Sequence, residues 1–141
     1  METTFGIIKP DATAAGHMGE IISAIEKAGF RLRALRLVHL TPAQAAGFYR
    51  VHEGKPFFAG LIEFMSSGPC VLMALQRDDA IAHWRRTMGA TDPTKAEPGT
   101  LRARFGTAIS RNAVHGSDAP ETAAAELGYF FTEAFDLVHP G

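Results

Sequence analysis

The chain has 141 residues, of which 46% are hydrophobic and 21% are charged, a length and balance that suit one globular domain spanning residues 1–141. Its 14 Lys and Arg against 15 Asp and Glu give a net charge of −1, which argues against non-specific capture of nucleic acid or an anionic membrane surface. The single cysteine, Cys70, excludes an internal disulfide, and because signal-peptide and membrane-spanning patterns are lacking we expect a cytoplasmic protein.

The N-terminal part of the sequence alternates strand and helix patterns. Thr3–Ile8 is short and rich in β-branched and aromatic residues, so it predicts a buried strand that stops at the turn Lys9–Asp11. Apolar residues then recur at helical spacing over residues 18–28, and Gly29 follows as a stop signal. Phe30–Leu40 alternates apolar residues with arginines and then changes phase, which predicts a long strand with a bulge and its arginines in water.

Two helix signals and a strand pattern come next. Thr41–Gln44 combines an N-cap threonine, a proline and a glutamine three residues after the cap, which predicts a helix that runs to about Arg50. Pro56 opens a second short helix, which the polar segment 66–69 closes. The apolar run Cys70–Leu75 is typical of a strand.

A helix and a long loop follow this strand. Asp78 is predicted to cap a helix with one apolar face, and Gly89 is predicted to end it. Residues 89–111 have a loop-like composition, with one helical turn predicted at Thr100–Phe105. Because long loops inside small domains are usually functional, this segment is a candidate binding loop.

The last predicted elements are a short strand at Asn112–Gly116 and a helix that runs through Leu127, with Ser117 or Asp118 as its cap. The order of elements is roughly β-α-β followed by β-α-β, with extra helices between the halves. This order predicts an α/β (α+β) fold in which helices cover a small antiparallel sheet.

One histidine stands out as a candidate nucleophile. His115 lies beside Gly116, directly before the cap of the last helix, and glycine leaves one side of the imidazole open. Histidine attacks phosphorus when one ring nitrogen is free and a carboxylate holds the other, and Glu126 on the following helix could supply that carboxylate. Taken alone, a histidine in this position is more often structural or exposed.

Several cations and hydroxyls could bind a polyphosphate, since phosphoryl transfer depends mainly on positioning and charge neutralisation. No histidine pair has metal-ligand spacing and no glycine-rich phosphate loop is present, so side chains would have to bind the phosphates. An exposed Phe57 could stack on a base. Each residue taken singly is as well explained as a solvated or turn-forming side chain. The candidates are Lys9, Tyr49, Arg85, Thr91, Arg102 and Asn112.

The segment Asn112–Asp118 resembles the N-x-x-H-G-S-D signature of nucleoside diphosphate kinases. Other segments resemble the same family in the same order along essentially the whole chain. They are Lys9-Pro10-Asp11, Phe48–His52, Gly54–Phe58, Gly89–Pro93 and Gly99–Arg102.

The resemblance implies a ferredoxin-like α/β sandwich with a four-stranded antiparallel sheet. It also implies ping-pong transfer of the γ-phosphate from a nucleoside triphosphate, typically ATP, to a nucleoside diphosphate, which maintains the NTP and dNTP pools. His115 would be the nucleophile that becomes phosphohistidine, Glu126 would orient it, and Ser117 would hydrogen-bond nearby. Mg²⁺ would arrive bound to the nucleotide phosphates, so that no metal site made by the protein is required.

The resemblance assigns the substrate contacts as well. Lys9 and Asn112 would meet the sugar hydroxyls, and Lys9 also the transferring phosphate. Phe57 and Leu61 would sandwich the base without reading its edges, which implies broad nucleotide specificity. The phosphates would be held by Tyr49, Arg85, Thr91 and Arg102, with His52 close by.

The family also implies a homo-oligomer, either a tetramer or a hexamer. The net charge of −1 leads us to expect neither a membrane nor a nucleic-acid partner. The chain has Ala103-Arg104 where many members carry Gly-Asp, in a loop that commonly lies near subunit contacts. Two alternatives differ in activity. A histidine-nucleophile phosphohydrolase would pass the phosphoryl group to water, and a non-catalytic nucleotide-binding oligomeric module would not form phosphohistidine.

Overall fold

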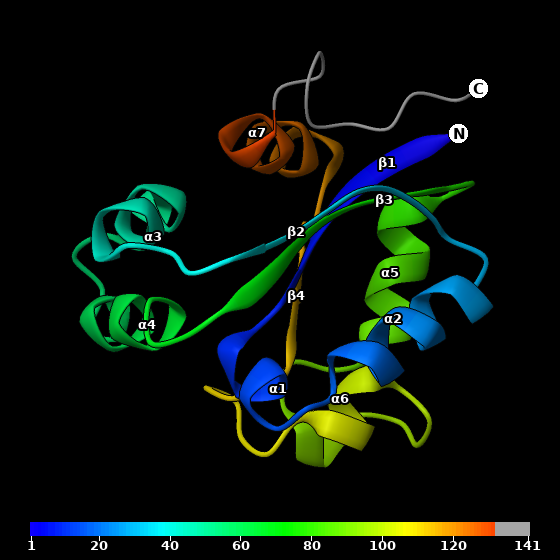
Figure 1. Ribbon diagram of the computed structural model, residues 1–141, viewed down its shortest axis with the longest axis horizontal. Coiled ribbons are helices and arrows are strands. Elements are labelled where there is room, and N and C mark those ends of the chain that lie inside the picture. The colour runs from blue at the N-terminus through cyan, green and yellow to red at the C-terminus, as the bar shows by residue number, and fades with distance from the viewer. Residues whose placement is uncertain (132–141) are drawn as a thin grey trace.

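The computed structural model describes residues 1–131, so the C-terminal end of the predicted domain 1–141 lies outside the described residues. At its centre is a four-stranded antiparallel sheet in the order β2-β3-β1-β4 (Figure 1). The strands are β1 (Glu2–Ile8), β2 (Arg31–Val38), β3 (Cys70–Arg77) and β4 (Val114–Gly116). The sheet order brings the two chain segments around His115 and Lys9 to neighbouring strands.

Helices cover both faces of this sheet. Figure 1 shows α2 and α5 on one side, and α3 and α4 on the other. This arrangement confirms the predicted helix-covered antiparallel sheet. The helices are α1 (Pro10–Ala14), α2 (Met18–Lys27), α3 (Pro42–Phe48), α4 (Phe58–Met65), α5 (Ala80–Met88), α6 (Leu101–Phe105) and α7 (Pro120–Phe130), with 3₁₀ turns at Arg50–His52 and Pro93–Lys95. No helix among residues 1–131 has the length and apolar character needed to cross a membrane.

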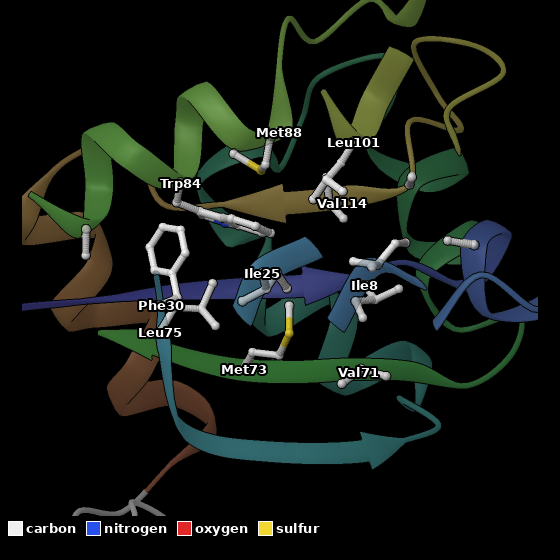
Figure 2. Close-up of a cluster of buried hydrophobic side chains, with 14 residues drawn as sticks. Ile8, Ile25, Phe30, Val71, Met73, Leu75, Trp84, Met88, Leu101 and Val114 are labelled. Atoms are coloured by element: carbon white, nitrogen blue, oxygen red, sulfur yellow. The ribbon is translucent and has the colours of Figure 1, made fainter. Parts of the chain in front are cut away.

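The two central strands are buried on both faces because their apolar side chains alternate between two cores. On β1, Phe5 and Ile7 pack toward α3 and α4, whereas Ile8 packs toward α2 and α5. Figure 2 shows the second of these cores, in which Trp84 of α5 lies over side chains from the sheet. The alternation follows from the period of two in an extended strand.

The edge strand β2 contains the predicted bulge. Its register against β3 shifts between Leu32 and Ala34, so that Arg33 is the extra residue. Leu35 and Leu37, which follow the bulge, are 48% and 61% exposed. A row of apolar side chains on the strand therefore remains uncovered by the described part of the chain.

Helix α3 begins as the sequence predicted. The Thr41 hydroxyl accepts a hydrogen bond from the Gln44 backbone N–H at 3.1 Å, and the Gln44 side chain accepts one from the Thr41 N–H at 2.9 Å. These reciprocal bonds satisfy two backbone donors that the helix itself cannot pair. The helix ends at Phe48, two residues before the predicted end, and a 3₁₀ turn continues to His52.

The predicted cap of α5 was wrong. The helix begins at Ala80 after Asp79, whose φ is +52°, and no side chain at that position accepts from the first turn. The carboxylate of Glu2 instead accepts from the Ile81 N–H at 2.8 Å. The first turn of α5 is thus capped by Glu2, which is 79 positions from Ile81 in the sequence, and not by Asp78.

The predicted cap of α7 was also wrong. The helix begins at Pro120, so its N-cap residue is Ala119, which makes no side-chain cap hydrogen bond. The Asp118 carboxylate accepts from the Thr122 hydroxyl at 2.8 Å, and the Ser117 hydroxyl reaches the side chain of Glu126. Proline at the first helical position removes one donor that a cap would have served.

Candidate active site

His115 lies on β4, the strand that pairs with β1 at the edge of the sheet. Its Cα is in register with that of Ile7, and its backbone carbonyl accepts a hydrogen bond from the Trp84 indole N–H at 3.2 Å. Trp84 is fully buried, so the strand that carries the histidine is tied to the core of the α5 face.

Gly116 has a different reason to be glycine from the one the sequence suggested. A Cβ on this residue would collide with the Trp84 ring and the Met88 methyl group. The glycine therefore permits close packing of β4 on α5.

The His115 imidazole is held by a carboxylate. Its Nε2 lies 2.9 Å from Oε1 of Glu126, and the Ser117 hydroxyl donates to the same oxygen at 2.8 Å. An ionised carboxylate can only accept, so the proton of the neutral imidazole resides on Nε2. The Nδ1 atom then keeps its lone pair, which makes it the nucleophilic nitrogen.

Aromatic rings surround the imidazole on the side of α3. Phe5, Phe48 and Tyr49 all lie edge-on to it, with ring centroids 5.5–6.1 Å away. Burial among these rings lowers the pKa of His115 below its usual value, and the contact with Glu126 only partly offsets this effect. The histidine is therefore neutral at pH 7 while 19% of its side chain remains exposed.

Tyr49 provides a buried hydroxyl next to the nucleophile. No side chain or backbone group among residues 1–131 hydrogen-bonds to this hydroxyl. Burial, reinforced by the negative charge of Glu126, raises the pKa of Tyr49, so the phenol keeps its proton. A buried donor without a partner is costly unless a ligand pairs with it.

Two depressions meet beside His115. One, of about 310 Å³, is lined by His115, Tyr49, His52 and Glu126, and the other, of about 800 Å³, lies between α5, α6 and the loop after α5. Gly116 and Asp118 line both. The second depression contains most of the predicted phosphate ligands, and its polar lining includes Arg85, Arg86, Thr91, Lys95, Thr100 and Arg102.

Arg102 is fixed at the floor of the second depression. Its guanidinium donates to the carbonyls of Gly89 at 3.1 Å and Val114 at 2.9 Å, while its buried Nε–H has no partner among the described residues. Burial lowers the pKa of Arg102 to about 10, and nearby Arg85 adds to this. The side chain thus stays cationic at neutral pH, and its position is set by the backbone.

Lys9 and Asn112 form a linked pair at the C-terminal end of β1. The Lys9 ammonium donates to the Asn112 side-chain oxygen at 2.9 Å, and the Asn112 amide donates to the Thr91 carbonyl at 3.0 Å. Burial, with a further contribution from Arg102, lowers the pKa of Lys9 to about 8. The pair connects the first strand to the loop after α5.

Phe57 and Leu61 lie at the start of α4. Phe57 is 51% exposed and its ring lies 5.3 Å from that of His52, whereas Leu61 is half-buried against the core of the α3 face. They are one helical turn apart on the same face, so they form a single wall. Neither lines the two depressions described above. Their predicted sandwich around a base stays a prediction.

The sequence did not predict a contact between Asp11 and Ala113. Asp11 was given no role beyond the turn after the first strand and the family-like segment Lys9-Pro10-Asp11, and Ala113 was only a spacer in the N-x-x-H-G-S-D segment. The Asp11 carboxylate accepts a hydrogen bond from the Ala113 N–H at 3.1 Å. The aspartate directly after a strand-ending proline was the available signal, but its partner is 102 residues away.

Comparisons with known proteins agree along nearly the whole chain. The family described as nucleoside diphosphate kinase matches residues 2–135. A nucleoside diphosphate kinase from Syntrophotalea carbinolica is 63% identical over 131 residues, covering 93% of this chain and 96% of that protein. One from Trichlorobacter lovleyi is 55% identical over 138 residues, covering 98% and 99%.

Solved structures give the same result for the fold. The nucleoside diphosphate kinase of Aquifex aeolicus superposes with a TM-score of 0.94 at 42% identity, covering 97% of this chain and 99% of that one. A halophilic nucleoside diphosphate kinase from Halobacterium salinarum, determined in complex with CDP, also gives a TM-score of 0.94, at 35% identity, covering 99% and 93%.

Proposed function

The chain belongs to the nucleoside diphosphate kinase family and transfers phosphate from nucleoside triphosphates to nucleoside diphosphates, and we propose that His115 carries the phosphoryl group between the two nucleotides. The observation that supports this most directly is the contact of Nε2 with Glu126, which leaves Nδ1 as the free nitrogen. No other histidine among residues 1–131 has an ion-pair contact with a carboxylate.

Each half of the reaction is an in-line displacement at phosphorus. The Nδ1 lone pair attacks the γ-phosphorus of the triphosphate, the bond to the β,γ-bridging oxygen breaks, and that oxygen leaves with the bond's electron pair on the diphosphate. A terminal oxygen of the second diphosphate then attacks the phosphorus of the phosphohistidine, and the nitrogen recovers its lone pair. Glu126 stabilises the positive charge that develops on the ring.

The phosphates are proposed to lie in the second depression. Arg85, Thr91 and Arg102 line it, and Lys9 completes the positive charge at the end of β1. The unpartnered hydroxyl of Tyr49 and the unpartnered Nε–H of Arg102 are donors that phosphate oxygens would pair. Because phosphoryl transfer has little covalent chemistry beyond the histidine, positioning these donors is the main contribution of the protein.

Kinases of this family generally need a divalent metal ion. We propose that it is Mg²⁺ and that the nucleotide carries it, because the depression presents arginines to the phosphates and residues 1–131 contain no group of three or more His, Cys, Asp or Glu able to hold a metal. Mg²⁺ on the phosphates would neutralise part of their charge. Arg85, Arg102 and Lys9 would pair with the remaining oxygens.

The nucleoside is proposed to meet Phe57, Leu61 and the Lys9–Asn112 pair. The half-exposed ring of Phe57 offers a face for stacking, which any base accepts. Lys9 and Asn112 supply polar atoms for the sugar hydroxyls. The structure of the Halobacterium salinarum relative is in complex with CDP, a pyrimidine diphosphate, which supports acceptance of pyrimidines by this chain.

The protein is proposed to form a homo-oligomer and to be cytoplasmic. The exposed Leu35 and Leu37 on edge strand β2 support a homo-oligomer, for which light scattering at working concentration would report a mass well above that of one chain. A tetramer and a hexamer would be separated by the same measurement. The net charge of −1 gives no support for a nucleic-acid partner, and a cytoplasmic location follows only from the sequence pattern.

A labelling experiment tests the role of His115. The protein is mixed with γ-labelled ATP and Mg²⁺ without an acceptor, and an acid-labile, base-stable phosphoenzyme is expected that GDP or CDP then discharges. His115→Ala should give no labelled protein, whereas His39→Ala, an exposed histidine bonded to the Ser66 carbonyl, should label like the parent. Label that passes only to water would instead favour the phosphohydrolase, and labelling of His115→Ala would contradict the assignment.

A further inference from the structure

Ala113 has a strained backbone two residues before the nucleophile. Its φ is +74°, and the Val114 N–H donates to the Asn112 carbonyl across it at 2.9 Å. A three-residue turn of this kind, with a central φ of about +75°, is rare because the side chain is crowded. Alanine has a Cβ and, unlike glycine, adopts this region only when the surroundings hold it there.

The turn after β1 hydrogen-bonds to both the N–H and the carbonyl of Ala113. The Lys9 N–H donates to the Ala113 carbonyl at 2.8 Å, and Oδ2 of Asp11 accepts from the Ala113 N–H at 3.1 Å. The other oxygen of Asp11 is buried and bonds to nothing among the described residues. Oδ2 is thus the one oxygen of this carboxylate that hydrogen-bonds within the described part of the chain, and its partner is the strained turn.

Functional side chains adjoin this turn on both sides. Asn112, immediately before it, contacts Lys9 and the loop after α5. Val114, immediately after it, accepts from Arg102 through its carbonyl, and His115 follows. A change in the direction of the chain at Ala113 would move Asn112 relative to His115.

We propose that Asp11 is a positioning residue that holds Ala113 in its positive-φ turn and so fixes the spacing between Asn112, with its partner Lys9, and the nucleophile His115. This inference rests on the proposed function, since spacing matters only if His115 is phosphorylated. Asp11 touches neither the imidazole nor the depressions, so it acts through the backbone.

A second effect of Asp11 has to be separated from this one. Its negative charge favours the protonated form of Lys9, so its loss would also lower the pKa of Lys9. The two effects respond differently to substitution. Asp11→Asn keeps an oxygen that can accept from Ala113 but removes the charge, whereas glycine at position 113 adopts a positive φ without needing the carboxylate.

The experiment compares rates of phosphoenzyme formation at saturating ATP and Mg²⁺ in single turnover. Asp11→Ala is expected to be at least tenfold slower than the parent, Asp11→Asn within threefold of it, and the double variant Asp11→Ala with Ala113→Gly within threefold. Glu26→Ala, an exposed carboxylate on α2, is the control and should match the parent. Thermal unfolding of each variant shows which are folded.

The outcomes decide between the mechanisms. Rescue by both the asparagine and the added glycine supports the positioning role, while equal losses in Asp11→Ala and Asp11→Asn without rescue would overturn it in favour of charge. An Asp11→Ala rate within twofold of the parent would also overturn it. If Asp11→Ala does not fold, a slow Asp11→Asn or a slow double variant overturns the proposal, and fast ones support it. Absence of phosphoenzyme in the parent would contradict the proposed function instead.

Discussion

Gly116 lies so close to the indole of Trp84 that a Cβ on the glycine would come within 2.5 Å of two ring atoms. The ring is fully buried and also bonds to the His115 carbonyl, so it cannot move without disturbing β4. Gly116→Ala is therefore expected to lower the free energy of unfolding by about 1–3 kcal/mol, as overpacked cores do. Urea denaturation followed by circular dichroism measures this.

Gly19→Ala is the matched control for that substitution. Gly19 lies inside α2 with nothing within 4 Å of its would-be Cβ. Alanine there should not lower stability and should raise it by at most about 1 kcal/mol, because it loses less backbone entropy in a helix and Gly19 lies in the first turn. Equal effects of the two substitutions would show that the Trp84 contact is unimportant.

Replacing Glu126 by glutamine should slow phosphorylation of His115 by about 10- to 100-fold, or roughly 1.4–2.8 kcal/mol in the barrier. The amide cannot stabilise the positive imidazole that forms, and its NH₂ group can present a donor to Nε2 and so favour the wrong tautomer. Single-turnover labelling measures the rate. Glu121→Gln, on the exposed first turn of the same helix, is the control. An unchanged rate for Glu126→Gln would remove the carboxylate from the mechanism.

Local sequence patterns predicted the fold well where the interactions are local. The Thr41 capping box and the β2 bulge are encoded within a few residues, and both are present. The predicted caps at Asp78 and at Ser117 or Asp118 were wrong, because a distant carboxylate serves the first turn of α5 and the Ser117 hydroxyl has another partner. Glu2 reaches α5 from the first strand, and Ser117 bonds to Glu126. A single sequence does not show which distant residue competes for such a position.

The candidate site likewise contains contacts that motif spacing predicts and contacts that it does not. Motif spacing placed Glu126 one helix after His115, and the structure brings their side chains to 2.9 Å. The hydrogen bond between Asp11 and Ala113 was not predicted, because it depends on a backbone φ of +74° at Ala113 that the residue type does not indicate. A glycine at position 113 would have indicated a positive φ, whereas an alanine gives no such indication.

Arg102 should tolerate lysine poorly although the charge is kept. Two nitrogens of its guanidinium donate to the carbonyls of Gly89 and Val114. The single ammonium nitrogen of lysine cannot occupy both positions. Arg102→Lys is expected to lose about 1–3 kcal/mol of stability and to raise the KM for ATP. Arg104→Lys, at an exposed ion pair with Glu20, should change neither measurably. A parent-like KM and midpoint of unfolding for Arg102→Lys would contradict this.

The dependence of kcat/KM on pH should be bell-shaped. Burial lowers the pKa of His115, and the protonated ring has no lone pair, so on the acid side activity is lost as pH falls through a value below about 6.5. Because Glu126 raises the pKa of His115, Glu126→Gln should move this acid limb to still lower pH. The alkaline limb should lie near pH 8, where Lys9, with its pKa lowered to about 8, loses its charge.

Lys9→Arg isolates the alkaline limb. Arginine stays protonated across the accessible range, so the fall in kcat/KM near pH 8 should disappear in this variant even if its maximum is lower. Ionisation of the nucleotide itself is common to both proteins and cancels in their ratio. Steady-state assays from pH 5 to about 10 provide the profiles. A limb near pH 8 that persists in Lys9→Arg would assign it to another group, since the Tyr49 phenol, whose pKa is raised, does not titrate there.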